Sequence, residues 1–477
     1  MDNAQSMSNK KNKIAIPKKK FEKFYKQFST VKEVTETPEW RNIYSKYFEF
    51  TRNELEIEIK KTPPGLPLHR PPPMKKRFSL GPATLVTAAF VGPGTVTACT
   101  LAGVNFGNAL LWALLFSTLA TMVLQEMAAR LGIVGRLGLG EALRAAVKTP
   151  VGRGLMVALV VSAIFIGNGA YEGGNISGAV LGLDTVFPDM PAGNIVWPLL
   201  IGAAALGILA RARYRVLERV FIGLVVTMSL AFIATFILIR PDLGEMISGL
   251  FIPSLPDGSV LTVIALIGTT VVPYNLFLHS AVARERFKGA EDLAASRADI
   301  GISISLGGLI SIAIVSTAAA SFFGTGIAIE SAGDMAVQLE PLLGKWSVVF
   351  MGIGLLAAGI SSAITAPLAA AYAATGVLGW EVDLKARRFK IIWALILAAG
   401  VAVSVSGLRP ISIIWFAQVA NGFLLPVMAV FLLKVMNDRN ILGDLVNTRR
   451  QNLMGMIVVV VTLLLSGRSL LSAFGFI

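Results

Sequence analysis

The sequence contains very few residues that bind metals through sulfur or imidazole. It has one cysteine, Cys99, and two histidines among 477 residues. A single cysteine cannot form an intrachain disulfide, and this composition excludes a thiolate or multi-histidine metal site. The sequence also lacks a Walker phosphate loop, a nucleophile elbow and a histidine-rich zinc motif. We therefore expect neither an enzyme nor an ATP-driven pump, and we expect no cofactor.

Charged residues are also scarce, whereas apolar residues are abundant. They make up 15% and 54% of the chain, respectively, whereas a soluble domain carries about 25% charged residues. Eleven apolar stretches are long enough to cross about 30 Å of hydrocarbon. The sequence therefore predicts an all-α membrane protein with about 11 transmembrane helices. The predicted spans are residues 80–103, 108–129, 154–181, 194–210, 216–239, 259–283, 300–323, 346–367, 390–406, 411–435 and 453–473.

The distribution of basic residues predicts how the chain crosses the membrane. The formal net charge is +14, and residues 1–80 contain 18 basic and 9 acidic residues. Of the 25 basic residues that follow, 21 fall in alternate loops. Basic residues concentrate in cytoplasmic loops, so we expect a plasma or inner membrane protein with a cytoplasmic N-terminus and an external C-terminus. The charge therefore does not indicate binding to nucleic acid.

The first 77 residues differ in composition from the rest of the chain. They are rich in lysine, and aromatic residues recur beside the lysines at helical spacing between Phe21 and Tyr47. Such a pattern is typical of amphipathic helices on anionic lipid; the alternative is a cytosolic, partly disordered extension. No apolar core of a cleavable signal peptide is present. We divide the chain into this extension (1–77), two five-helix repeats (78–240 and 241–436) and a last helix with the C-terminus (437–477).

Two of the predicted helices are interrupted by proline near their middle. The interruptions lie at Gly92–Thr95 and at Val271–Asn275, and their prolines are 180 positions apart. Proline removes an amide donor and clashes with the preceding turn, and lipid cannot solvate the backbone groups that are freed. An odd number of spans per half inverts the second half in the membrane, which is the geometry of inverted-repeat transporters. In such proteins, paired broken helices indicate the substrate site.

Small and polar residues at the two breaks are candidates to bind a substrate. Glycines there permit close approach of a ligand. Exposed carbonyls favour a cation and a helix N-terminus favours an anion, so the breaks alone do not decide the sign of the ligand. The alternative is a packed kink whose threonines bond back to their own helix. The substrate-binding candidates are Gly92, Gly94, Thr95, Thr269, Val272, Tyr274, Asn275 and Gln418.

Ionisable and amide side chains inside the predicted spans form a second set of candidates. Glu172 is the clearest of them, because a carboxylate within the membrane is costly and indicates a proton relay or an ion ligand unless it pairs with an arginine or backbone donors. His279 can titrate near neutral pH, with a satisfied interior histidine as the alternative. Glu126 and Arg130, at i and i+4, predict a structural ion pair. Asn421 can line a cavity, although a contact between helices is favoured.

Several motifs resemble those of the Nramp family (natural resistance-associated macrophage proteins). The run Pro273–Ser280 (PYNLFLHS) is similar to the family's sixth-helix motif P-H-N-L-Y/F-L-H-S, and Gln125–Gly132, Gly354–Gly359 and Asn437–Arg439 give supporting matches. The resemblance spans about residues 80–473. It implies a leucine-transporter-like fold with two inverted five-helix repeats and discontinuous helices 1 and 6. It also implies proton-coupled transport of divalent metal.

The predicted site departs from the metal ligands that are usual in that family. Gly92 and Thr95 replace the aspartate and asparagine of the motif D-P-G-N, Val272 replaces a methionine, and Tyr274 replaces the first histidine. A thioether favours transition metals, and a carboxylate offsets the cost of dehydrating a dication. The resemblance implies Gly92, Thr95 and Thr269 as the metal-binding positions. We expect the cation to be bound partly hydrated.

The resemblance also extends the candidate proton pathway. It aligns Glu172 with a proton-path aspartate and Asn175 with a glutamate that follows it, so the pathway candidates are Glu172, Asn175 and His279. We therefore expect a secondary active transporter of a divalent cation that works by alternating access, with proton coupling left open. A carrier of a small neutral or anionic organic solute and a relative that does not transport are the alternatives. The expected partners are the transported cation or solute, protons and membrane lipid, and no oligomeric state is indicated.

Overall fold

The computed structural model describes residues 7–9, 12–14, 92–211 and 215–473. The chain divides into two units, Met1–Phe78 and Ser79–Ile477. In the first unit, the short strands β1 (Met7–Asn9) and β2 (Asn12–Ile14) pair antiparallel, with Met7 opposite Ile14. The amphipathic segments expected between Phe21 and Tyr47 lie outside the described residues.

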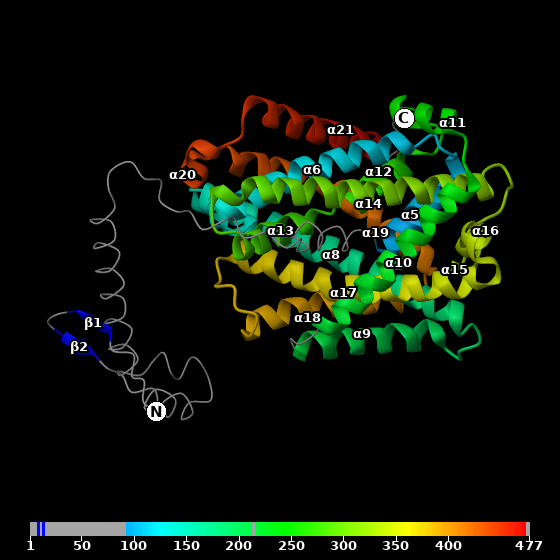
Figure 1. Ribbon diagram of the computed structural model, residues 1–477, viewed down its shortest axis with the longest axis horizontal. Helices are drawn as coiled ribbons and strands as arrows, with labels where there is room; N and C mark the ends of the chain where they lie inside the picture. The colour runs from blue at the N-terminus through cyan, green and yellow to red at the C-terminus, as the bar shows by residue number, and fades with distance from the viewer. Residues whose placement is uncertain (1–6, 10–11, 15–91, 212–214, 474–477) are drawn as a thin grey trace. The chain divides into compact units, whose positions relative to one another are not determined.

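The second unit is a bundle of long helices (Figure 1). The elements of its first half are α5 (Pro93–Phe106), α6 (Leu111–Val134), α7 (Leu139–Ala146), α8 (Pro150–Val186), α9 (Gly193–Arg211), α10 (Arg215–Ile239) and α11 (Leu243–Phe251). Those of its second half are α12 (Val260–Thr270), α13 (Pro273–Arg286), η1 (Ala290–Asp292), α14 (Leu293–Phe322), α15 (Ala332–Ala336), η2 (Val337–Leu339), α16 (Glu340–Leu343), η3 (Gly344–Trp346), α17 (Ser347–Leu378), α18 (Arg387–Ser404) and α19 (Pro410–Met436). The chain ends with α20 (Arg439–Leu442), η4 (Gly443–Leu445) and α21 (Arg449–Ala473).

Each predicted span corresponds to a helix or a pair of helices. Within the described ranges, nine helical stretches are long and apolar enough to cross a membrane. The predicted spans outside this set are 80–103, of which the structure describes only the part from Gly92, and 390–406, which matches the shorter helix α18. The predicted bounds 154–181 and 346–367 were too narrow, since α8 and α17 extend beyond them at one or both ends.

The described helices pack into two large hydrophobic cores, with a third, small cluster between α6, α13 and α14. The smaller core joins α8, α9, α17 and α18 through buried residues such as Ile176, Ile201, Ile364 and Trp393. The larger core joins α5, α6, α12, α13, α14 and α19 with the remaining faces of α8 and α17. The smaller core therefore consists of the third and fourth spans of the first half together with the eighth and ninth, which are their equivalents in the second half.

The packing of the other spans is also reciprocal between the halves. Helix α5 packs against α14, and α13 packs against α6. The first span thus contacts the seventh, and the sixth contacts the second. Such exchange of partners is expected when two equivalent halves are related by a pseudo-two-fold axis.

The sixth span is broken where the sequence predicted a discontinuity. Helix α12 ends at Thr270 and α13 begins at Pro273, so that Val271 and Val272 are not helical. Proline at the first position of α13 lacks an amide that would have no helical partner there. Helix α5 likewise begins at Pro93, after Gly92 in extended conformation, and the residues that precede Gly92 lie outside the described part of the first span.

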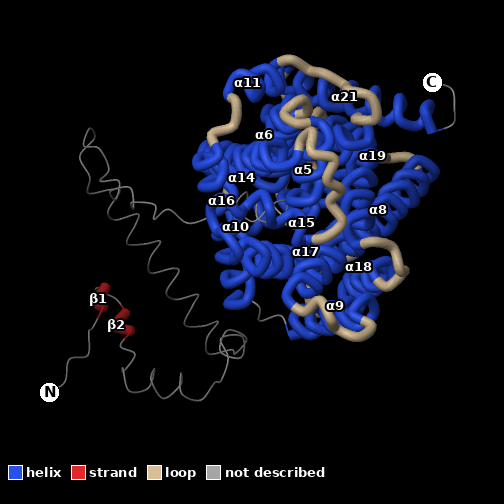
Figure 2. The backbone as a smooth tube through the Cα atoms, turned by 90° about the vertical axis from the view of Figure 1, so that its right-hand side faces the viewer, coloured by secondary structure: helices blue, strands red, loops and turns tan. Residues whose placement is uncertain are grey.

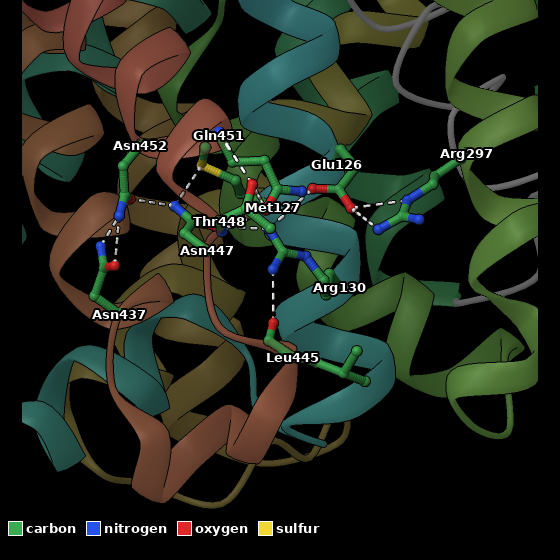
Figure 3. Close-up of polar contacts among 10 residues, drawn as sticks. All are labelled: Glu126, Met127, Arg130, Arg297, Asn437, Leu445, Asn447, Thr448, Gln451 and Asn452. Atoms are coloured by element: carbon green, nitrogen blue, oxygen red, sulfur yellow. Dashed lines mark hydrogen bonds and ion pairs between the residues drawn. The ribbon is translucent and has the colours of Figure 1, made fainter.

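A polar network holds α6 against the end of the bundle that carries α20 (Figure 3), which we call the α20 end. The buried guanidinium of Arg130 donates to the carbonyl oxygen of Leu445 at 2.6 Å, to Asn447 Oδ1 at 2.7 Å and to Glu126 Oε2 at 3.1 Å. The other oxygen of Glu126 accepts from Arg297 of α14 at 2.8 Å. The predicted Glu126–Arg130 ion pair is confirmed, and it forms part of a structural joint between α6, α14 and the segment before α21.

The close packing of α12 against α19 can be tested by substituting a glycine. A Cβ atom at Gly422 would collide with the carbonyl oxygen of Ile264, while a Cβ atom at Gly301 of α14 would meet nothing within 4 Å. We expect Gly422→Ala to destabilise the fold by about 1–3 kcal/mol through overpacking and to lower the apparent Tm in detergent. Gly301→Ala is the matched control. Equal melting temperatures for the two variants would contradict the close approach.

Candidate functional site

The start of α5 places a helix N-terminus inside the core. Gly92 is extended, and its carbonyl oxygen accepts from the amides of Thr95 at 3.1 Å and Val96 at 3.2 Å. Pro93, Gly94 and Thr95 are all buried. The first amides of a helix lack intrahelical acceptors, and they carry the positive end of the helix dipole. The first backbone amides of α5 are therefore polar groups in apolar surroundings.

The break in the sixth span supplies both kinds of helix end. The Val271 amide still donates to the carbonyl oxygen of Ile267 at 2.8 Å, and the Asn275 amide donates to that of Val272 at 3.0 Å. Between these bonds, the chain leaves the helical conformation at Val271 (φ −97°, ψ 74°) and Val272 (φ −78°, ψ 118°). The last carbonyls of α12 and the first amides of α13 thus lie on the two sides of the break.

The start of α5 and the break in the sixth span meet through a pair of threonines. Thr95 Oγ1 of α5 and Thr269 Oγ1 of α12 lie 2.9 Å apart, and their side chains are 1% and 0% exposed. These residues are 174 positions apart in the sequence. The structure therefore brings together two of the three positions that the family resemblance assigned to metal, with Gly92 three residues before Thr95 on the same turn.

Gln418 of α19 closes another side of this junction. A Cβ atom at Gly94 would collide with the Gln418 side-chain amide, so only glycine permits their contact. Gln418 Nε2 donates to the carbonyl oxygen of Ile414 at 3.2 Å, whereas its buried Oε1 has no hydrogen-bond partner among the described residues. The amide oxygen is consequently available to a bound ligand or water.

The remaining candidates follow the break in the sixth span. Asn275 is completely buried, and neither of its side-chain amide atoms has a partner in the described part of the chain. The Tyr274 ring packs edge-on against Tyr171 of α8, with 5.2 Å between ring centroids. Val272 is buried and apolar. Buried polar groups are nearly always hydrogen-bonded, so the unpaired Asn275 amide indicates a place for a polar ligand or water.

A cavity leads away from this junction on one side. It is small, with a volume of about 20 Å³, and lies between α8, α13 and α19, with Pro273, Tyr274, Asn168 and Asn421 in its wall. Its residues on α13 and α19 all lie at or beyond the break in the direction of the α20 end. Asn421 therefore lines a cavity, which is the reading that the sequence favoured less than a contact between helices.

Glu172 and Asn175 form a separate polar pair within α8. Asn175 Nδ2 donates to Glu172 Oε2 at 3.1 Å. Glu172 is 0% exposed, and no other Asp or Glu side chain of the described residues is buried. A Cβ atom at Gly400 would collide with Cβ and Cγ of Glu172, so α18 packs directly on the stem of this side chain. Glu172 thus lies on the face of α8 that packs against α18.

His279 does not join that pair. Its Nδ1 lies 2.6 Å from Gln125 Oε1 of α6, and both side chains are buried. No hydrogen bond of the described chain links His279 to Glu172 or Asn175. The structure thus divides the three predicted proton-pathway residues between two places. Gln125 was not among the predicted site residues. An amide side chain in an apolar helix is nevertheless a signal of a buried hydrogen-bond partner, which here is His279.

The donor set at the junction consists of oxygen and amide groups. Hydroxyls come from Thr95 and Thr269, amide groups from Gln418 and Asn275, and carbonyls from the helix ends. In the described ranges, no three His, Cys, Asp or Glu side chains gather as a metal cluster. Oxygen ligands suit hard cations, which keep part of their water when few carboxylates are present.

Comparison with known sequences places this architecture in a family. The model of the "Natural resistance-associated macrophage protein-like" (Nramp) family matches residues 83–472. A divalent metal cation transporter MntH from Klebsiella pneumoniae is 30% identical over 394 residues, which cover 81% of this chain and 92% of that protein. The MntH of Bacillus subtilis is 30% identical over 381 residues, 78% of this chain and 86% of that protein.

Solved structures agree with the sequence comparison. A manganese transporter of Eremococcus coleocola superposes with a TM-score of 0.67 at 25% identity, covering 83% of this chain and 87% of that one. A transporter of the nucleobase-cation-symport-1 family superposes with a TM-score of 0.53 at 14% identity, covering 84% and 94%, and shows likeness of fold alone. The expected leucine-transporter-like helical fold is therefore confirmed, and the chain belongs to the Nramp family of multi-pass membrane transporters.

Proposed function

We propose that this protein is a secondary active transporter that moves a divalent metal cation by alternating access around its helix breaks. Family membership supports this proposal, since relatives in Klebsiella pneumoniae and Bacillus subtilis are divalent metal cation transporters. The observation that carries it is the contact between Thr95 and Thr269, where two helix ends meet in the core. Such mid-membrane helix ends form the substrate sites of inverted-repeat transporters.

The cation would bind at this junction through oxygen atoms. The ligands would be the hydroxyls of Thr95 and Thr269 and the unpaired amide oxygens of Gln418 and Asn275. The carbonyl oxygen of Gly92 already accepts from two amides of α5 and is therefore not among them. These neutral groups offset only part of the charge of a dication, because no carboxylate lies among them. A hard ion that retains water, such as Mg²⁺ or Mn²⁺, fits these ligands better than a soft, fully dehydrated one.

The position of the cavity supports an assignment of the inward side of the proposed site. It extends from Pro273 and Tyr274 toward the α20 end, where the basic residues Arg284 and Arg286 end α13. Because basic loops favour the cytoplasm, we assign the α20 end to the cytoplasmic side of a plasma or inner membrane. The small cavity would then lie on the inward side of the proposed site.

Protons would move through a path beside the metal site. Glu172 is buried with Asn175 as its hydrogen-bond donor, and Tyr171, its neighbour in α8, contacts Tyr274 at the break. A protonation change at Glu172 can therefore alter packing next to the substrate site. The His279–Gln125 pair joins α13 to α6 and would couple movement of the inner half-helix to α6.

Reconstitution in proteoliposomes tests the proposed function. Uptake of Mg²⁺, Mn²⁺ and Cd²⁺ is measured with trapped fluorescent indicators, beside uptake of a panel of small labelled carboxylates and neutral solutes. We expect divalent metal uptake above that of empty liposomes. Gly94→Leu is the blocked control, because its side chain would occupy the place of the Gln418 amide. Organic solute flux without metal flux, or no flux at all, would contradict the proposal in favour of one of the two alternatives.

Val272 offers a prediction on metal selectivity. The valine side chain has no atom that can bind a metal. A methionine thioether at this buried position would favour soft metals. We expect Val272→Met to raise Cd²⁺ affinity relative to Mg²⁺ about tenfold, equivalent to about 1.4 kcal/mol. Competition of Cd²⁺ against Mg²⁺ uptake measures this ratio. Val272→Leu controls for side-chain bulk, and the same ratio in both variants would count against the assigned position of the cation.

A further inference from the structure

Three buried polar side chains line the small cavity between α8, α13 and α19. Asn168 is 4% exposed, Asn421 is 2% exposed and Tyr274 is 3% exposed. Neither asparagine side chain forms a hydrogen bond to another described residue. The Tyr274 hydroxyl is fully enclosed and has no hydrogen bond of good geometry, although Tyr171 lies beside it. Because buried polar groups are nearly always hydrogen-bonded, these three groups indicate a polar occupant of the cavity.

The size and lining of the cavity suit a single water molecule. Its volume is about 20 Å³, whereas one buried water needs at least about 10–15 Å³. A buried water typically forms about three hydrogen bonds to groups that would otherwise be unpaired, and Asn168, Asn421 and Tyr274 can supply them. The rest of the wall is mostly apolar, with residues such as Phe277 and Leu424. The polar side chains therefore determine where the water is held.

The cavity lies close to the proposed cation ligands. Helices α8 and α19 run side by side (Figure 2) and supply Asn168 and Asn421 to the cavity wall. Asn421 follows Gln418 by three residues on α19, which corresponds to about 4.5 Å along the helix. Tyr274 directly precedes Asn275, whose side-chain amide is also unpaired among the described residues. About one helical turn thus separates the polar wall of the cavity from the ligands at the junction.

A cation at this junction has to keep part of its water shell. The proposed ligands are hydroxyl and amide groups without charge, and Mg²⁺ dehydrates reluctantly. Water bound to a cation points its hydrogen atoms away from the ion, so it needs acceptors in the next layer of contacts. Amide and phenol oxygens are such acceptors, and a contact through water is nearly as favourable in enthalpy as a direct one. The cavity offers both kinds of oxygen in this second layer.

We propose that this cavity is a hydration subsite, in which a water molecule held by Asn168, Asn421 and Tyr274 hydrogen-bonds to the water shell of the bound cation. The subsite rests on the transport function proposed above and adds a determinant of its selectivity. An ion that keeps its water, such as Mg²⁺, gains from these contacts, whereas an ion that binds through direct ligands does not. The three side chains thus favour Mg²⁺ over Cd²⁺ without touching either ion.

Uptake of two ions by the same variants in proteoliposomes tests the subsite. Asn421→Leu, alone and with Asn168→Leu, removes the amide groups at similar volume. We expect the half-saturating Mg²⁺ concentration to rise about three- to tenfold, as for a lost hydrogen bond, and that of Cd²⁺ to change less than about twofold. The matched control is Ser177→Ala, which removes a buried hydroxyl of α8 that lies 3.0 Å from Ser404 Oγ of α18. A Mg²⁺ value that is unchanged, or that rises no more than the Cd²⁺ value, would overturn the subsite.

Thermal unfolding in detergent provides a second measurement that does not depend on transport. Asn421→Asp supplies a carboxyl group to the water shell of the cation, and that group lacks a partner when no cation is bound. We expect a lower Tm than that of the parent without metal, and a rise with Mg²⁺ at least about twice that of the parent, because a ligand of the folded state stabilises it. Asn194→Asp adds the same group at an exposed position of α9 as the control. A Mg²⁺ effect on Asn421→Asp no larger than on the parent would overturn the subsite. A larger effect, together with absence of metal flux in the parent, would instead contradict only the proposed function.

Discussion

Replacing Thr269 by valine is expected to weaken cation uptake by about ten- to hundredfold. Valine has nearly the shape of threonine but removes one oxygen ligand, and it leaves the Thr95 hydroxyl without the bond that now measures 2.9 Å. Hydrogen bonds and similar contacts with charged groups contribute about 1.5–3 kcal/mol, which corresponds to about ten- to hundredfold in affinity. The effect should appear in the half-saturating metal concentration.

The chain offers closely matched controls for this substitution. Thr270, the next residue, donates its hydroxyl back to the carbonyl oxygen of Leu266 at 3.0 Å within α12. Thr270→Val should therefore leave the half-saturating concentration nearly unchanged, and Thr269→Ser should retain most of the affinity of the parent. If Thr269→Val and Thr270→Val behave alike in metal uptake, the junction between α5 and α12 is not the binding site.

The broken helix was predictable because its causes are local. Proline at position 273 acts on its own turn of the chain, and an apolar stretch on both sides of it requires a membrane span. Hydropathy likewise located the spans, since burial in lipid depends on composition over about 20 residues. The structure then confirmed the break between Thr270 and Pro273.

The contacts that give these residues their roles were not predictable from one sequence. Thr95 and Thr269 were both candidates, but no local pattern specifies that their hydroxyls meet across 174 positions. Gln125 is 154 positions from its partner His279. Gln338 lies outside the predicted spans, yet the fold buries it completely, and its amide donates to Thr100 Oγ1 across 238 positions. Side-chain pairing depends on tertiary packing, which periodicity does not encode.

The position of the buried Glu172 side chain bears on how metal uptake would be coupled to a proton gradient. The proposed metal site consists of neutral oxygen donors, while the buried side chain of Glu172 lies in α8 against Gly400 of α18. Glu172 is therefore not among the proposed ligands of the metal. A change at Glu172 should therefore affect the driving force for uptake more than the affinity for metal.

Glu172→Gln is expected to abolish stimulation of uptake by an inward proton gradient. Glutamine keeps the shape of the side chain and an oxygen that accepts from Asn175 Nδ2, but it cannot bind and release a proton. Metal uptake driven only by the metal gradient should persist, with the half-saturating concentration changed by less than about threefold, because the ligands at the junction remain. The measurement compares uptake with and without a pH gradient, together with an internal pH indicator. Asp184→Asn, near the end of the same helix, is the matched control. If Glu172→Gln keeps both gradient stimulation and proton entry, the carboxyl group serves only as the acceptor of the Asn175 hydrogen bond within α8.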